Sequence, residues 1–159
     1  MYPHITHIVY QPRNHQYPEG HADAFHRIPA QSVTLRADYG IEGDHKAGRN
    51  PRRQINILSD RWLAEMDARG YDITPGAFGE QITVTGIDLD TLPQGTIITL
   101  GPTQLKIIGP RDGCSRLESA QAKAGLAGQP IGVMTQVLVG GEIKVGDMVR
   151  IQLMVTEEK

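Results

Sequence analysis

Short apolar runs separated by glycine-rich turns recur along the chain. Five of these runs have the length and the β-branched content of strands: residues 4–10, 31–37, 54–58, 81–85 and 132–139. Two further pieces, 92–101 and 143–151, each join an apolar residue and a glycine turn to a short alternating strand, as chains do at the corners of small barrels. Gly140-Gly141 follows the fifth run and predicts a hairpin.

Helical patterns are few. Ser59 or Asp60 can cap a helix that stops at Gly70, with Trp62, Leu63 and Met66 sharing its core-facing side. A second short helix, ending at Gly125, has Leu117, Ala120 and Ala124 along one side. A parallel sheet with crossover helices would need a helix between most strands. The pattern therefore predicts a mainly β fold, a small closed or nearly closed mixed β-barrel with about two peripheral helices.

The chain has 159 residues, which is the size of one domain, and we expect residues 1–159 to form a single unit. Its net charge is −2, from 16 basic and 18 acidic residues, and this balance favours neither a nucleic acid nor a membrane as partner. The first residues resemble no signal peptide and no run is long enough to span a bilayer. A single cysteine excludes an internal disulfide, so we expect a reducing, cytoplasmic location.

That cysteine, Cys114, lies in a turn marked by Gly109, Pro110 and Gly113, after the strand-like run 105–108. A side chain between a strand and a helix is usually accessible, and the neighbouring cations Arg111 and Arg116 favour the thiolate form. A lone cysteine is commonly a small buried hydrophobe. This turn has few apolar groups to pack around sulfur, which favours a chemical role.

Basic residues gather in a second region. Lys46, Arg49, Arg52 and Arg53 fall within a short stretch beside the glycine-rich segment 40–48. The two interpretations are a solvated loop and an anion site built from guanidinium groups and close backbone. His45 lies in the same segment and is either a plain loop residue or a proton shuttle.

Other polar residues leave alternatives open. Asn56, inside an otherwise apolar strand, is either a satisfied core amide or a ligand contact. Asp44 and Glu80, beside glycines, are expected mainly to cap turns. The histidines of the polar stretch 11–29 (His15, His21 and His26) match no zinc spacing, and we expect a loop there.

Four segments together resemble the MOSC domain, the family named for the C-terminal domain of molybdenum-cofactor sulfurase. They are residues 40–48, 53–59 and 75–83 and the arginine-plus-cysteine turn around Cys114. Their order and spacing match the family over nearly the whole chain, and a short free-standing member is expected. One departure is Gly113, where many members have proline.

The resemblance implies a β-barrel and a cysteine that handles molybdenum or sulfur. Under the first alternative Cys114 ligates the metal of a molybdopterin cofactor, as in reductases of N-hydroxylated compounds. Under the second it is a sulfur-transferring persulfide carrier. The cofactor's phosphate would be held by the basic residues and their polar neighbours: His45, Lys46, Arg49, Arg53, Asn56 and Arg111.

Partners follow from the same resemblance. A cysteine desulfurase or an electron-transfer protein is expected to supply sulfur or electrons. Pyridoxal phosphate is not expected here, because that cofactor belongs to the desulfurase. The remaining alternative is a non-catalytic binding module in which Cys114 is incidental.

Overall fold

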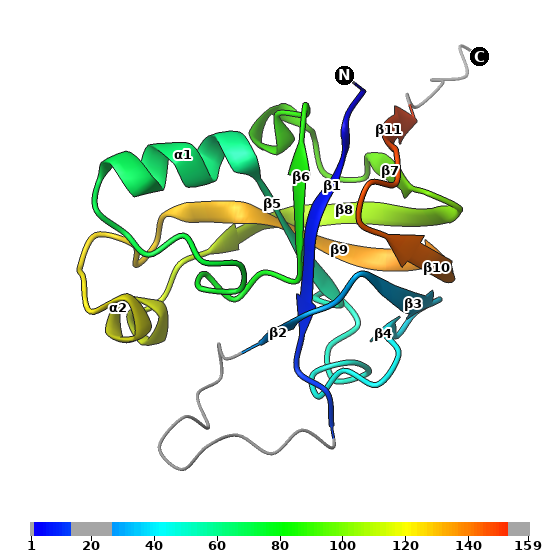
Figure 1. The fold of residues 1–159 in the computed structure, drawn as a ribbon, viewed down its shortest axis with the longest axis horizontal. Coiled ribbons are helices and arrows are strands. Elements are labelled where there is room, and N and C mark those ends of the chain that lie inside the picture. Colours follow the sequence, from blue (N-terminus) through cyan, green and yellow to red (C-terminus); the bar gives the residue numbers. More distant parts are fainter. Residues whose placement is uncertain (1, 14–26, 153–159) are drawn as a thin grey trace.

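The computed structural model describes residues 2–13 and 27–152 (Figure 1). The described elements are, in chain order, β1 (His4–Tyr10), β2 (Ile28–Pro29), β3 (Ser32–Arg36), β4 (Gly40–Ile41), β5 (Ile55–Ser59), α1 (Asp60–Ala68), β6 (Ile82–Thr85), the 3-10 turn η1 (Leu89–Thr91), β7 (Ile97–Leu100), β8 (Thr103–Asp112), α2 (Ser115–Gln121), β9 (Pro130–Val139), β10 (Gly141–Lys144) and β11 (Val149–Gln152). The expectations for His15, His21 and His26 fall outside these residues. No helix in the described ranges is long and apolar enough to cross a bilayer.

Eight strands form one strongly curled sheet in the order β11-β7-β8-β9-β5-β6-β1-β2. Its neighbouring strands are antiparallel except β5 and β6. These two run parallel, and α1 lies between them in the sequence. A second sheet, β10-β3-β4, packs beside it. The predicted mainly β, mixed-barrel fold with two helices is confirmed.

The curled sheet nearly closes on itself. The start of β1 forms backbone hydrogen bonds with the segment that leads into β11: Ile5 N to Asp147 O at 3.0 Å and Gly146 N to Ile5 O at 2.8 Å. The smaller sheet covers part of the remaining opening, since Asp38 N donates to Val137 O of β9 at 2.8 Å. The barrel therefore has few exposed strand edges.

The barrel interior is filled by aliphatic side chains that alternate with outward ones along each strand. Ile57 and Ile82, at the parallel β5–β6 pair, and Leu105 on β8 are fully buried there. The polar groups of this interior are satisfied: Thr135 Oγ1 donates to Ile55 O at 2.8 Å, and Thr103 Oγ1 to Leu100 O at 2.7 Å. The period-two pattern of the sequence thus produces one barrel with an aliphatic interior.

A second core lies outside the barrel, between the sheet and the helices. Leu58 of β5 faces this second core. Its other members include Leu63 and Met66 of α1, Leu117 of α2, and Phe78 from the segment between α1 and β6. Helix α1 begins as predicted, with Ser59 Oγ accepting the Trp62 N–H at 3.2 Å, and Gly70 follows its C-cap residue with φ +87°. Trp62, expected in the core, is only half-buried.

Two local predictions were wrong. Gly140-Gly141 does not close a hairpin, because β10 pairs with β3 while β9 lies between β8 and β5. The chain changes sheets at this point, which local turn signals cannot reveal. Helix α2 ends at Gln121, and Ala122 adopts a left-handed conformation with φ +52°. Of the three residues expected on its inner side, only Leu117 is buried.

Candidate functional site

Cys114 is exposed and stands between β8 and α2. It is the N-cap residue of α2: its carbonyl oxygen accepts the N–H groups of Leu117 and Glu118, both at 3.1 Å, while its side chain makes no capping hydrogen bond. The backbone is thus fixed and the sulfur is left accessible. The accessible position expected from the sequence is what the structure shows.

Close backbone packing holds the cysteine's turn in place. Gly113 N donates to Gln129 O at 2.8 Å, and Gly128 N donates to Gly113 O at 3.0 Å. A Cβ atom at position 113 would overlap the carbonyl oxygen of Leu126, so glycine is required by close approach. Gly113, which stands where many family members have proline, therefore allows the loop that follows α2 to pack closely against this turn.

Glu118 fastens that loop to α2. Its Oε2 atom accepts the N–H groups of Gly125, Leu126 and Ala127 at 2.7, 2.8 and 3.1 Å. These three hydrogen bonds lower the pKa of Glu118 and keep it ionised. One carboxylate thus connects the helix that Cys114 caps with the loop that packs on Gly113.

Arg111 was expected in the turn with Cys114, and the structure places it in a strand. Strand β8 continues through Gly109 and Pro110 to Asp112, with register shifts against β9 on both sides of Pro110. The Arg111 side chain is buried, and its guanidinium donates a hydrogen bond to the carbonyl oxygen of Phe78. Burial, with the positive charges of Arg53 and Arg27, lowers its pKa to about 10.

Glu80 is buried and interacts electrostatically with this arginine. Its Oε1 atom accepts the Phe78 N–H at 3.1 Å, in keeping with the turn-capping role expected from the sequence. Its Oε2 atom is buried and has no hydrogen-bond partner among the described residues. Burial raises the pKa of Glu80, and the backbone hydrogen bonds and Arg27 oppose that rise.

Lys46 comes from the glycine-rich loop that follows β4. The buried Asp44 anchors this loop by accepting the Gln11 N–H at 2.9 Å, and His45 N donates to Gln11 O at 2.7 Å. Burial, followed by the charges of Arg27, Arg111 and Arg116, lowers the pKa of Lys46 to about 8. Lys46 therefore interacts electrostatically with three arginines from separate parts of the chain.

Arg53 and Asn56 flank the same region at β5. Arg53 is exposed and its Nε donates to the sulfur of Met134 at 3.3 Å. Met134 pairs with Asn56 in the β5–β9 ladder and with Gly109 in the β8–β9 ladder. Asn56 is buried, and its Oδ1 atom has no partner among the described residues.

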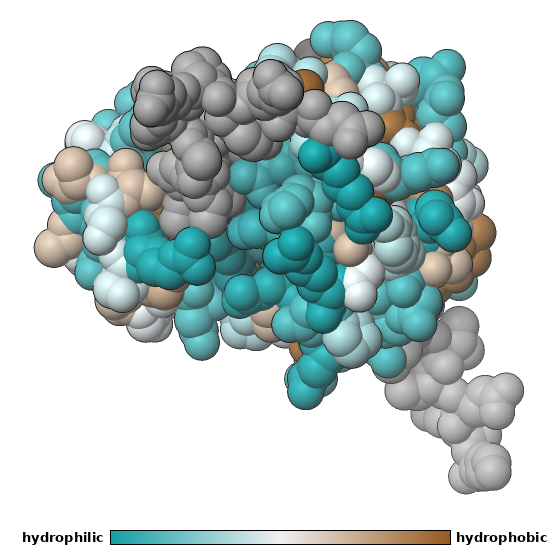
Figure 2. Space-filling model, turned by 90° about the horizontal axis from the view of Figure 1, so that it is seen from below, coloured by the Kyte–Doolittle hydropathy of each residue, from teal (hydrophilic) through white to brown (hydrophobic). Residues whose placement is uncertain are grey.

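We use the term cationic site for the group of cations that interact electrostatically with Lys46 or Arg111, the latter of which also interacts with Cys114: Arg27, Lys46, Arg53, Arg111 and Arg116. The predicted Lys46, Arg53 and Arg111 gather there. Arg49 and His45 contact each other instead, with Arg49 Nη2 and His45 Nε2 at 3.2 Å. The segments that build this region lie at the lower side of Figure 1, and the face seen from below is predominantly hydrophilic (Figure 2).

Sequence reasoning did not include Arg27 in the site, and it gave Arg116 only an influence on the thiol. The signal for Arg116 was its closeness to Cys114. Arg27 follows a polar stretch that contains no motif, so the sequence contained no signal for it. The pairing of β2 with β1 places Arg27 beside Gly76, near the site. Within the described ranges, no group of three or more His, Cys, Asp or Glu side chains is arranged to hold a metal ion.

The MOSC domain family model matches residues 44–150, which include the Lys46 loop, β5, the Glu80 turn and Cys114. The chain belongs to the MOSC domain family, which is associated with molybdenum-cofactor sulfurase-like proteins.

Among curated proteins, the chain is similar to protein YiiM of Escherichia coli K12, with 25% identity over 121 residues, or 69% of this chain and 52% of that protein. It therefore spans about half the length of this relative. YuaD from Bacillus subtilis has a similar fold, with a TM-score of 0.71 at 20% identity over 95% of this chain and 96% of that one. YiiM from Geobacillus stearothermophilus has a TM-score of 0.69 at 20% identity, covering 95% and 75%.

Proposed function

We propose that this protein binds a molybdopterin-type cofactor, with Cys114 as the protein's ligand to molybdenum and the cationic site holding the cofactor's phosphate. The supporting observation is an exposed thiol beside half-buried and buried cations, Lys46 and Arg111, whose pKa values are lowered to about 8 and about 10. Like charges gathered at one place repel one another, and a bound phosphate would reduce that repulsion.

The donor set fits this cofactor. Molybdenum accepts a soft thiolate, so one accessible cysteine is a sufficient protein ligand. Guanidinium groups such as those of Arg53 and Arg116 match the oxygens of a phosphate. A persulfide carrier needs an accessible thiol but no anion site, so the cationic site favours the cofactor.

Two buried oxygens add to the fit. Asn56 Oδ1 and Glu80 Oε2 have no hydrogen-bond partner among the described residues, although buried polar atoms nearly always have one. Both belong to residues beside the cationic site, and both accept hydrogen bonds. N–H or O–H groups of a polar ligand such as a pterin would satisfy them.

The bound group would supply two-electron redox chemistry, and reduction of N-hydroxylated compounds is the reaction class that the family resemblance suggests. The chain's own residues would orient the cofactor through Arg53 and Arg116 and fix the sulfur through the capped turn at Cys114. Lys46, with a pKa of about 8, would be able both to release and to take up a proton near neutral pH.

The test is the molybdenum and pterin content of protein purified from a host that makes the cofactor. We expect about one molybdenum per chain in the wild type and little in Cys114→Ala. Arg53→Gln keeps the thiol and should lose about tenfold in retention of the pterin phosphate. Arg52→Gln, a neighbouring exposed arginine outside the cationic site, is the matched control. A full molybdenum load in Cys114→Ala would refute the proposal.

A second candidate is favoured by the exposure of Cys114, and it is persulfide carriage. The Cys114 thiolate would attack the sulfane sulfur of a desulfurase-bound persulfide, forming a new S–S bond while the donor thiolate leaves. After incubation with a cysteine desulfurase and cysteine, intact mass spectrometry should then find one added sulfur on the wild type and none on Cys114→Ala. An unmodified wild type under these conditions would exclude this role.

If both tests fail, the non-catalytic module remains. This alternative predicts that Cys114 in the native protein reacts with an alkylating reagent as slowly as a buried thiol does.

A further inference from the structure

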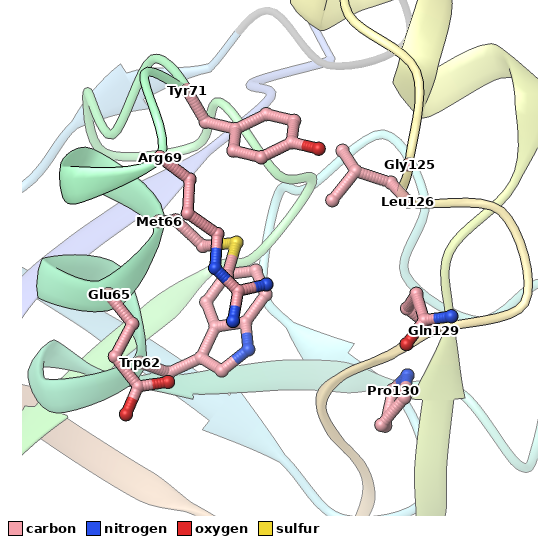
Figure 3. A pocket seen from close by; sticks show the side chains of 9 residues that line it. All are labelled: Trp62, Glu65, Met66, Arg69, Tyr71, Gly125, Leu126, Gln129 and Pro130. Carbon is pink, nitrogen blue, oxygen red and sulfur yellow. The ribbon is translucent and has the colours of Figure 1, made fainter.

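A separate pocket of about 220 Å³ lies on the far side of the loop that packs against Cys114's turn. Figure 3 shows its two walls. One runs along α1 and just beyond it, with Trp62, Met66, Arg69 and Tyr71, and the other comes from the segment 125–130. In this view the guanidinium of Arg69, on the α1 wall, overlaps the Trp62 indole. None of these residues belongs to the cationic site.

The apolar part of the pocket is aromatic. Trp62 and Tyr71 are half-buried and pack on the fully buried Phe78 at ring-centroid distances of 4.8 and 6.3 Å. The Met66 sulfur lies beside the Trp62 indole in the view of Figure 3. Held by Phe78 from behind, the two rings form a fixed surface for a flat apolar group.

The polar groups around the opening lack partners. Within the described residues, the Trp62 indole N–H, the Arg69 guanidinium, the Glu65 carboxylate and the Gln129 amide form no hydrogen bond or ion pair. Tyr71 differs, because its hydroxyl donates to Ala124 O at 2.7 Å. Several donors around an aromatic wall are the usual composition of a small-ligand pocket.

Charge selects the kind of ligand. Arg69 lines the pocket, and the Lys123 ammonium lies 5.1 Å from the ring centre of the lining residue Tyr71. Glu65 is the one acid among the lining residues. At the end of α1, Met66 O accepts the N–H groups of Arg69 and Tyr71. The Glu118 carboxylate next to residues 125–127 is already engaged by three backbone N–H groups. With Lys123 counted, two cations stand against Glu65, and Arg69 is the group with which an anionic ligand would pair.

We propose that this pocket is a ligand site for a small aromatic carboxylate, whose ring packs on Trp62 and Tyr71 and whose carboxylate pairs with Arg69. A volume of about 220 Å³ is below the range of pockets for drug-sized ligands, which begins near roughly 300 Å³, and it admits a single ring with one acidic substituent. The guanidinium fork matches the two carboxylate oxygens. This site is independent of the molybdenum proposal.

The pocket is also connected to the thiol. Its wall residue Gln129 accepts the Gly113 N–H, and the carbonyl of Leu126 lies where a Gly113 side chain would be. Glu118 holds the backbone of this wall against α2 through three hydrogen bonds. A ligand that pushes on or stiffens residues 125–130 therefore acts on the residue before Cys114, and binding changes the reactivity of the thiol.

The chain contains one tryptophan and one cysteine, so each end of this connection has its own probe. Benzoate is the test ligand and benzamide is its neutral counterpart. We expect saturable binding of benzoate, seen both in Trp62 fluorescence and in ligand-observed NMR. Arg69→Gln should weaken it about tenfold or more, because a charge-assisted pair is lost. Arg61→Gln, an exposed arginine on the same helix outside the pocket, is the control and should bind as the wild type does.

Three results would overturn the ligand assignment: no saturable signal by either method, equal affinity for benzamide, or equal affinity in Arg69→Gln. Circular dichroism and thermal unfolding would verify that both variants fold. The connection is tested by the alkylation rate of Cys114 in the presence of saturating benzoate. We expect at least about a twofold change in the wild type and none in Arg69→Gln. An unchanged rate at saturation would disprove the connection.

Discussion

The barrel interior and the cationic site share strand β8 but obey opposite rules. In the interior, Leu105 and Ile57 pack among aliphatic neighbours, and the hydroxyl of Thr135 has a backbone partner at 2.8 Å. In the cationic site Arg111 is buried, and so is the neighbouring Glu80, whose Oε2 atom has no partner among the described residues. The first region gains from burial, whereas the second carries the cost of desolvated charge.

Strand β8 shows the change from one rule to the other. Its first part alternates buried aliphatic residues with half-buried ones, and its last part buries Arg111 after the register shift at Pro110. Natural proteins depart from regular packing mainly where they bind or react with something. The difference between the two regions therefore supports a ligand at the cationic site, and three substitutions test it.

The largest effect is expected inside the barrel. Leu105→Ala removes a fully buried side chain from β8 and leaves a cavity, which should lower the free energy of unfolding by about 3 kcal/mol. Ile108→Ala on the same strand is the control, because Ile108 is only half-buried and should cost about 1 kcal/mol or less. Urea unfolding measures both. Equal losses would mean that the interior is not the tightly packed region.

A middle-sized effect is expected at the cysteine's turn. Gly113→Ala would bring a methyl group onto the Leu126 carbonyl, so the loop must move, at a cost of about 2 kcal/mol in unfolding free energy. The alkylation rate of Cys114 should change with it. Gly109→Ala is the matched control, since no heavy atom lies within 4 Å of an added Cβ there. If both variants behave alike, close packing does not hold the thiol.

The smallest effect depends on pH. Lys46→Met removes one charge from the cationic site and should raise the unfolding free energy by about 1 kcal/mol or less at neutral pH, because the side chain is only half-buried and solvent screens its charge. The pKa of Lys46 is lowered from 10.5 to about 8, so the charged form is the costly one in the folded protein. The penalty is complete below pH 8 and fades as the pH rises toward the unfolded value.

The gain in unfolding free energy from Lys46→Met should therefore decrease between about pH 8 and pH 10.5, as followed by thermal unfolding. Lys106→Met, which changes a half-buried lysine of β8 outside the cationic site, is the control for the loss of one lysine charge. A benefit that stays constant with pH would show that Lys46 carries no charge penalty. Added inorganic pyrophosphate should raise Tm more in the wild type than in Lys46→Met, because the cations gain an anionic partner.

Much of the fold was predictable because its signals are local. The run 4–10 became β1 with the predicted bounds, and Ser59 caps α1 through a hydrogen bond within the same turn. Gly140-Gly141 gave the same kind of local signal and misled, because β10 pairs with β3, far away in sequence. A turn signal predicts that the chain changes direction, but it does not predict with which strand the next segment pairs.

The sequence by itself determined the barrel, through strand-length apolar runs and glycine turns, and it determined that one exposed cysteine follows β8 and precedes α2. These features depend on residues that are neighbours along the chain. Only the tertiary structure decided that Arg27 joins Lys46 and Arg111 beside that cysteine while Arg49 turns to His45. Charges interact through space, so their grouping, and the pKa shifts it causes, follow from how distant segments pack.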